Sequence, residues 1–264
     1  MGLSGKTAVI TGSGRAIGAA IAIRMAQDGA NVVLNSRSTP DEIDEIAKEC
    51  RNYGIKVLTV LADVSTKEGV DKLAQETYQQ FPEVDILINN VGISPTCPFL
   101  EMTDEEWHKV MAVNIDSIYY CSKAFVPNMV ERQWGRVVNI TGHAYLGVGG
   151  SVHTKSGKSA AVGFTRGLAG EVAPYQITVN HIAPGLIDTP ARRNKYYRDD
   201  KSDLSKGGNT TDRPWGPEES VEKVPLKRLG KPEEMSALVA FLCSEEGAYL
   251  TGQTYLVNGG MTAV

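Results

Sequence analysis

The chain has 264 residues, 42% of them hydrophobic, which is enough to bury one large core and predicts a single α/β domain over residues 1–264. Its 27 Lys and Arg residues against 31 Asp and Glu residues give a formal net charge of −4, so no general positive field attracts nucleic acid or an anionic membrane surface. The 4 cysteines are scattered without metal-ligand spacing, and no apolar run approaches the ~20 residues that span a bilayer, which favours reduced thiols in a cytoplasmic protein.

Apolar, β-branched runs alternate with amphipathic stretches along the whole chain. This alternation is typical of βαβ units, which build a parallel sheet covered by helices on both faces. After the first run, Ile17, Ile21 and Met25 recur at helical spacing until Asp28-Gly29 supplies a helix stop. The sequence therefore predicts an α/β, doubly wound Rossmann fold with a seven-stranded parallel sheet. The predicted strands are residues 7–11, 31–35, 57–62, 84–89, 136–140, 177–182 and 254–257.

Three later helices are expected to begin with a capping box. In this motif a Ser or Thr side chain and the side chain of a Glu three residues later each accept a bond from the other's backbone N–H group. The predicted boxes are Thr39 with Glu42, Ser65 with Glu68, and Thr103 with Glu106.

One long irregular segment, about residues 188–225, follows the sixth predicted strand. A loop of this length in a compact domain is typically a lid or a binding loop. Basic and aromatic residues at 191–198 are followed at once by acids, so we favour a substrate-covering loop over a nucleic-acid patch.

The first strand ends in the turn Thr-Gly-Ser-Gly-Arg-Ala-Ile-Gly, residues 11–18, which runs directly into a helix. Glycines in such a turn let the backbone approach a pyrophosphate, whose charge is met by free N–H groups and by the positive end of the helix dipole. A glycine cluster alone fits an ordinary tight turn equally well, but its place inside a βαβ unit favours a dinucleotide. The residues of the turn expected to bind it are Gly12, Ser13, Gly14, Arg15, Ile17 and Gly18.

The turn resembles the Thr-Gly-x-x-x-Gly-x-Gly motif of the short-chain dehydrogenase/reductase family, with Ala16 in place of the middle glycine. Other marks of the family follow in order, including Asn114 in a Val-Asn-Ile segment and Val-Asn-Gly-Gly at 257–260. The resemblance implies a doubly wound seven-stranded fold, a nicotinamide cofactor, a small-molecule substrate and a homotetramer. It also implies that the cofactor is bound by Asp63, Val64, Asn90, Val91, Gly92, Lys158, Pro184, Gly185, Ile187 and Thr189.

The end of the second strand indicates which nicotinamide cofactor is used. An NAD enzyme usually places a carboxylate there, and this charge would repel a 2′-phosphate. Here the run is Leu34-Asn35-Ser36-Arg37, without an acid. Arg37, Ser36 and the nearby Arg15 can instead bind the phosphate, so we predict a preference for NADP(H), with NAD(H) as the alternative. The alternative is that both arginines are solvated on the surface and bind no phosphate, which fits the same sequence.

The catalytic pattern of the family is incomplete in this chain. The resemblance implies a catalytic serine after the fifth strand and a Tyr-x-x-x-Lys pair, in which the lysine lowers the pKa of the tyrosine. Lys158 is present, but Thr154 occupies the tyrosine position and Gly142 the serine position. A Tyr-x-x-x-Lys string does occur at residues 119–123, but it precedes the fifth strand, and Tyr119 is expected in the core or at an interface.

Substitute proton donors lie near the expected site. His143 and Tyr145 follow the fifth strand and His153 adjoins the threonine, although each fits an ordinary hydrogen-bonded loop residue as well. The candidate catalytic set is therefore Lys158, Asn114, His143, Thr154 and Tyr145. The leading hypothesis is an NADP(H)-dependent oxidoreductase acting on a ketone or a secondary alcohol. The alternatives are a non-catalytic NADP(H)-binding sensor and a non-redox enzyme built on the same scaffold.

Overall fold

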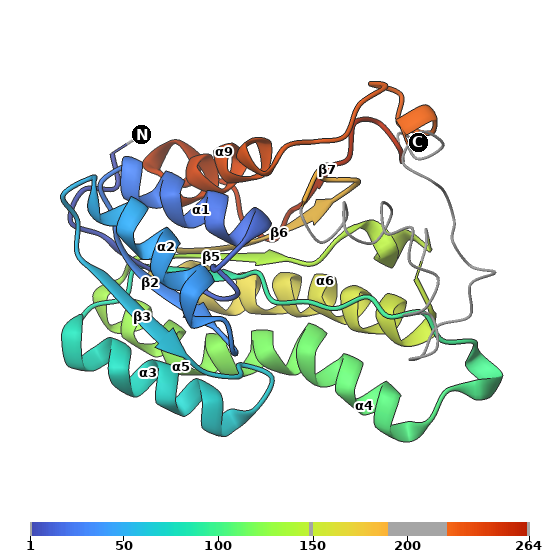
Figure 1. Cartoon of the computed structure of the whole chain (residues 1–264). Coiled ribbons are helices and arrows are strands. Elements are labelled where there is room, and N and C mark those ends of the chain that lie inside the picture. The colour runs from blue at the N-terminus through green and yellow to red at the C-terminus, as the bar shows by residue number, and fades with distance from the viewer. Residues whose placement is uncertain (1, 148–149, 190–220, 263–264) are drawn as a thin grey trace.

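The computed structural model describes residues 2–147, 150–189 and 221–262. One parallel sheet runs in the order β3-β2-β1-β4-β5-β6-β7 through the middle of the molecule (Figure 1). The order steps outward from β1 in both directions, which is the doubly wound arrangement that the sequence predicts. The seven strands are β1 (Thr7–Ile10), β2 (Asn31–Ser36), β3 (Val57–Leu61), β4 (Ile86–Asn89), β5 (Gly135–Ile140), β6 (Ile177–Pro184) and β7 (Thr254–Val257).

Helices cover both faces of the sheet, because alternate residues of each strand point to opposite sides. On β1, for example, Ala8 and Ile10 pack into one core cluster and Val9 into the other. Helices α1, α2 and α9 cover the first face and α3, α5 and α6 the second (Figure 1). The main helices are α1 (Ala16–Gln27), α2 (Pro40–Arg51), α3 (Lys67–Gln80), α4 (Asp104–Met111), α5 (Ser117–Arg132), α6 (Val152–Val172) and α9 (Pro232–Cys243).

Of the three predicted capping boxes, one is confirmed. Thr103 forms it at the start of α4. The box predicted at Ser65 is wrong, because the cap of α3 is the next residue, Thr66, whose side chain accepts a backbone N–H bond. Thr39 does precede α2, but it makes no capping bond, and its hydroxyl lies 2.6 Å from that of Ser36.

The predicted lid at about 188–225 falls mostly outside the described residues. Its flanks are joined by a parallel bridge between Ile187 and Gly230, in which the N–H of Asp188 donates to the Gly230 carbonyl at 2.8 Å. The segment therefore leaves and re-enters the fold at one place, beside the carboxyl end of β6.

The cysteines are thiols, as predicted: Cys50, Cys121 and Cys243 are buried and Cys97 is partly exposed. Across the three described stretches, no helix is both long enough and apolar enough to cross a membrane, and no cluster of His, Cys, Asp or Glu side chains is arranged to hold a metal ion.

Candidate active site

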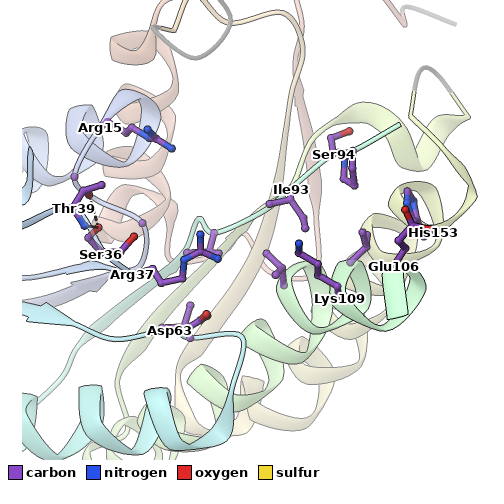
Figure 2. A pocket seen from close by; sticks show the side chains of 18 of the residues that line it. Arg15, Ser36, Arg37, Thr39, Asp63, Ile93, Ser94, Glu106, Lys109 and His153 are labelled. Carbon is purple, nitrogen blue, oxygen red and sulfur yellow. Dashed lines mark hydrogen bonds between the residues drawn. The ribbon is translucent and has the colours of Figure 1, made fainter. Parts of the chain in front are cut away.

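A cavity of about 840 Å³ lies over the carboxyl ends of β1, β2, β3 and β4 (Figure 2). Its walls are the segments that follow these strands, together with one side of α4. Open parallel sheets bind their ligands at this edge. The residues predicted to bind a dinucleotide that line the cavity are Gly12, Gly14, Arg15, Ser36, Arg37, Asp63, Val64 and Val91.

Glycines make the turn between β1 and α1 possible. Gly12 has a φ of +62°, in the left-handed region that favours glycine. A Cβ on Gly18 would lie 2.2 Å from the Gly12 carbonyl oxygen, so only glycine fits there. The side-chain amide of Asn90 donates to the same carbonyl and to that of Thr11, both at 3.1 Å. Gly18 and Asn90 thus shape the turn without lining the cavity. Of the other residues predicted for the turn and for the segment after β4, Ser13, Ile17 and Gly92 do not line it either.

The start of α1 fits an anion. No side chain caps this end of the helix, and its first turn carries no acid. An uncapped helix start presents backbone N–H groups and the positive end of the dipole. Ala16, where the resemblance places a glycine, has a φ of +53°. The chain therefore keeps the backbone conformation of a glycine with a side chain that disfavours it.

The end of β2 carries hydroxyls and a cation instead of an acid. Ser36 Oγ and Thr39 Oγ1 lie 2.6 Å apart, and the exposed Arg37 lies near them in the cavity wall (Figure 2). Arg15 borders the same end of the cavity, with its Nη1 3.9 Å from Oε1 of Glu42. At this distance and exposure the ion pair is weak. Both guanidinium groups therefore remain available to a phosphate.

Asn35 is a site residue that the sequence analysis missed. Its buried Nδ2 donates to the carbonyls of Val60 at 3.2 Å and Ala62 at 3.0 Å, and its Oδ1 accepts from the N–H of Gly12 at 3.4 Å. One amide thus ties the turn after β1 to the end of β3. A lone Asn in an apolar strand is the signal that could have found it, because a buried amide needs partners.

Asn114 lies in a widened turn, η2 (Ala112–Asp116), between α4 and α5. Single π-helical turns of this kind are frequent at functional sites. The buried Asn114 side chain accepts from the N–H of Ile93 at 2.9 Å and donates to the Ile93 carbonyl at 3.0 Å. It therefore holds the segment after β4 in place without lining the cavity itself.

The cavity wall formed by α4 and residues 93–98 was also missed. Glu106 and Lys109 of α4 face it, together with His153 from the start of α6 (Figure 2). Burial lowers the pKa of His153, while the nearby Glu106 acts in the opposite direction. No sequence motif marks these residues, because α4 has the pattern of an ordinary amphipathic helix.

Lys158 extends from α6 to a buried position beside Gly142. Its ammonium donates to the carbonyl oxygen of Thr141, and burial lowers the pKa of Lys158 to about 8. Gly142 has a φ of +122° and a ψ of 165°, a combination essentially confined to glycine. A Cβ on Gly142 would lie 2.8 Å from Lys158 Nζ. The ammonium therefore fills the space that a side chain at position 142 would need.

The other candidate catalytic side chains face different neighbours. His143 Nδ1 lies 3.0 Å from the backbone carbonyl at the end of β6. Tyr145 stands edge-on to His181, with ring centroids 5.8 Å apart, and burial raises the pKa of Tyr145. Thr154 is fully buried, and its hydroxyl lies 3.4 Å from His153 Nδ1. The cavity of Figure 2 is not lined by Lys158, His143, Tyr145 or Thr154.

The segment after β6 lies apart from that cavity. Gly185 packs so closely on Asn258 that a Cβ would approach the Asn258 Cα to 2.6 Å, which explains why glycine follows Pro184. Ile187 lines a second cavity of about 260 Å³ together with Asn258. Pro184, Gly185, Ile187 and Thr189 are therefore not joined to the other predicted cofactor residues by one cavity.

The Tyr-x-x-x-Lys string at 119–123 lies on α5, outside both cavities. Tyr119 is 49% exposed, so its placement in the core is wrong. Only the expectation of an interface stays a prediction.

Comparison with known proteins decides the family. A family model described as enoyl-(acyl carrier protein) reductase matches residues 12–262. A 3-oxoacyl-(acyl-carrier-protein) reductase, FabG, of Aquifex aeolicus is 35% identical over 261 residues, which is 98% of each chain. The chain belongs to the short-chain dehydrogenase/reductase family. Its seven-stranded parallel sheet agrees with this assignment.

Other members of the short-chain dehydrogenase/reductase family extend the comparison. The (2S)-((R)-hydroxy(phenyl)methyl)succinyl-CoA dehydrogenase subunit BbsD of Thauera aromatica is 33% identical over 260 residues, 98% of each chain. The structure of L-sorbose reductase from Gluconobacter frateurii, complexed with NADPH and L-sorbose, superposes with a TM-score of 0.90 at 34% identity, covering 100% of this chain and 99% of that one. These relatives are oxidoreductases, and this chain is an enzyme of the same family.

Proposed function

We propose that this enzyme is an NADP(H)-dependent oxidoreductase that interconverts a ketone and a secondary alcohol by hydride transfer. The observation that carries the proposal is the end of β2, where Ser36 and Arg37 replace the acid that would repel a 2′-phosphate. The cavity there, the uncapped start of α1, the weakly paired Arg15 and the exposed Arg37 fit an anionic dinucleotide. The sorbose reductase, whose structure is complexed with NADPH, supports the same choice; NAD(H) is the alternative.

A bound reduced nicotinamide would supply the hydride. The turn 12–18 would hold the pyrophosphate, Arg15 and Arg37 the 2′-phosphate, and Asp63 with Val64 the adenine side. Asn114 would position the segment after β4 through its two bonds to Ile93. Pro184, Gly185, Ile187 and Thr189 complete the proposed cofactor set from the other side of the sheet edge.

We further propose that Gly142 and Thr154 replace the family's catalytic serine and tyrosine. The glycine-only backbone at position 142 and the full burial of Thr154 support this reading. Lys158 and Asn114 are retained, and the proton-transfer role passes to another group among the candidate residues. A threonine hydroxyl does not ionise near neutral pH, so Thr154 is not expected to act as the acid.

The test is a direct comparison of cofactors and substrates. NADPH and NADH affinities are measured by calorimetry, and turnover is followed by absorbance of the reduced cofactor with acetoacetyl-CoA and L-sorbose, the ketones that the named relatives suggest. We expect tighter NADPH binding and turnover of at least one ketone. No affinity for either dinucleotide would refute the proposal.

The replaced serine and tyrosine favour one second candidate, a protein that binds NADP(H) as a sensor and catalyses nothing. Tight NADPH binding without turnover on a broad panel of ketones and alcohols would support it. A third reading, a non-redox reaction on the same scaffold, predicts product formation from a substrate without any change in cofactor absorbance.

The remaining proposals concern the whole molecule. The resemblance supports a homotetramer of single-domain chains, with the loop at about 188–225 inserted as a substrate cover. Light scattering coupled to size-exclusion chromatography measures the assembly. Fractionation of cells would test the expected cytoplasmic location.

A further inference from the structure

Gly142 and Lys158 form one interlocked unit. The ammonium of Lys158 donates to the Thr141 carbonyl and lies 2.8 Å from where a Cβ of Gly142 would be. A side chain at position 142 and this placement of the ammonium therefore exclude each other. The backbone adds a second restriction, since the φ of +122° and ψ of 165° suit glycine alone.

The groups around Lys158 leave its ammonium without a carboxylate partner among the described residues. From β6, His181 binds the Thr141 hydroxyl through Nε2 at 2.7 Å, and Lys158 helps to lower the pKa of His181. From the segment after β5, His143 lies against the end of β6 and Tyr145 against the ring of His181. Arg166, farther along α6, adds positive charge near His181. Burial alone accounts for the lowered pKa of Lys158.

We infer that Lys158 itself donates the proton to the substrate oxygen, its ammonium standing beside Gly142 in the space that a side chain there would fill. This inference rests on the proposed ketone reduction. It gives Lys158 a direct part in bond-making, where the family pattern uses the lysine to tune a tyrosine that this chain lacks.

The proton step balances with the groups at hand. In the proposed reaction the reduced nicotinamide would give up a hydride and be oxidised. As the carbonyl carbon gains this hydride in its new C–H bond, the π-electron pair of the C=O bond moves to oxygen. One N–H bond of the Lys158 ammonium breaks while an O–H bond forms. The products are a secondary alcohol and a neutral Lys158 amine, which regains a proton from solvent. In the oxidation direction the neutral amine accepts the proton instead.

Two of the competing donors are disfavoured by their chemistry. The Thr154 hydroxyl does not ionise near neutral pH, and it faces His153. Tyr145 packs on His181, and its raised pKa makes it a poorer acid. His143 contacts the backbone carbonyl at the end of β6 through Nδ1 at 3.0 Å, and the pH dependence of kcat distinguishes its other ring nitrogen from Lys158 as the donor.

The pH dependence of kcat separates these donors. If Lys158 donates, kcat for reduction is constant at low pH and falls above about 8, and kcat for oxidation rises toward the same midpoint. An ordinary histidine would give a midpoint near ~6.5, and a tyrosine one at ~10 or higher. A midpoint in either of those positions, or a flat profile, would overturn the inference.

Lys158→Arg is the first variant, because arginine keeps the positive charge but does not release a proton at neutral pH. We expect kcat to fall by ~10² to 10⁴, and the dissociation constant for NADPH is measured beside it because Lys158 is also in the predicted cofactor set. Lys155→Arg, one turn earlier on α6, is the matched control and should change neither value. Retention of kcat in Lys158→Arg would overturn the inference.

Gly142→Ala tests the interlock without altering the lysine. The added Cβ displaces the ammonium, so we expect the pH midpoint to move upward and kcat to fall by about tenfold or more. Thermal unfolding and NADPH affinity establish that the variant is folded. A folded Gly142→Ala protein with an unchanged midpoint and kcat would contradict the proposed unit.

A third measurement needs no turnover. Trace acetylation of all lysines between pH 6 and 11, read by mass spectrometry, gives the titration of each amine in one sample. A Lys158 midpoint of about 8 agrees with the inference. A midpoint near ~10.4, the ordinary lysine value, overturns the donor role of Lys158 but leaves the proposed ketone reduction standing. Absence of turnover on every ketone together with a midpoint of about 8 refutes the proposed function, and the donor role with it.

Discussion

Ala16→Gly is expected to stabilise the protein, although alanine is normally the better helix residue. Ala16 begins α1 with a φ of +53°. A left-handed conformation costs an L-residue roughly 1–2 kcal/mol, and glycine avoids this cost. Against it stands the extra freedom that glycine gains in the unfolded chain, about 0.4–1 kcal/mol. The balance is a gain of about 0.5–1 kcal/mol in the free energy of unfolding.

The assay is thermal unfolding with and without NADPH. A gain of this size raises Tm by about 1–2 °C for a domain of this length. The matched control is Ala20→Gly in the same helix, where the same change is expected to lower stability by about 1 kcal/mol. Equal losses of Tm in both variants would show that the backbone of Ala16 is not strained and would refute the reasoning.

Other substitutions give equally specific results. Arg37→Asp should weaken NADPH binding by ~10-fold to 150-fold and leave NADH affinity nearly unchanged by calorimetry, because one charge-assisted bond is worth about 1.5–3 kcal/mol; equal losses for both would contradict the phosphate role. Gly18→Ala should abolish dinucleotide binding in the same assay, because its Cβ would lie 2.2 Å from the Gly12 carbonyl oxygen. Asp85→Asn, at the far edge of the sheet, removes a buried carboxylate 2.7 Å and 3.2 Å from two cations and should lower stability by about 3 kcal/mol in urea without changing NADPH affinity. Burial lowers the pKa of His181 to about 4, so the neutral form is favoured in the folded state. The free energy of unfolding should therefore be at its full value above pH ~6.5 and fall as the pH drops toward about 4. His181→Gln should remove this dependence on pH when the free energy of unfolding is measured in urea.

The strands were predictable because parallel strands are buried on both faces and therefore appear as continuous apolar runs. All seven lie within two residues of the predicted limits, and 254–257 is unchanged. Helix starts were harder. Ser65 and Thr66 are adjacent hydroxyl residues, and only the course of the backbone decides which one caps α3. The cap follows from geometry that a local pattern does not contain.

The site divides in the same way. The glycine turn and Arg37 follow from residue types at fixed spacing, and the structure brings both to one cavity. Asn35 was missed because its value depends on β3, which is distant in sequence. The placement of the Lys158 ammonium depends likewise on the backbone at Gly142. Contacts between distant segments are the part of the site that one sequence does not encode in a readable pattern.

Three side-chain amides bind the backbone of the loops around the cleft. Asn35 and Asn114 each donate one or more hydrogen bonds and accept another, and Asn90 donates two. An amide neither gains nor loses a proton across the physiological range, and it carries no net charge for salt to screen. These three contacts are thus insulated from acidity and ionic strength. A response of catalysis to either variable would report on the reacting groups and on the arginines proposed to bind the phosphate, which makes this enzyme suited to proton-inventory and salt-titration kinetics.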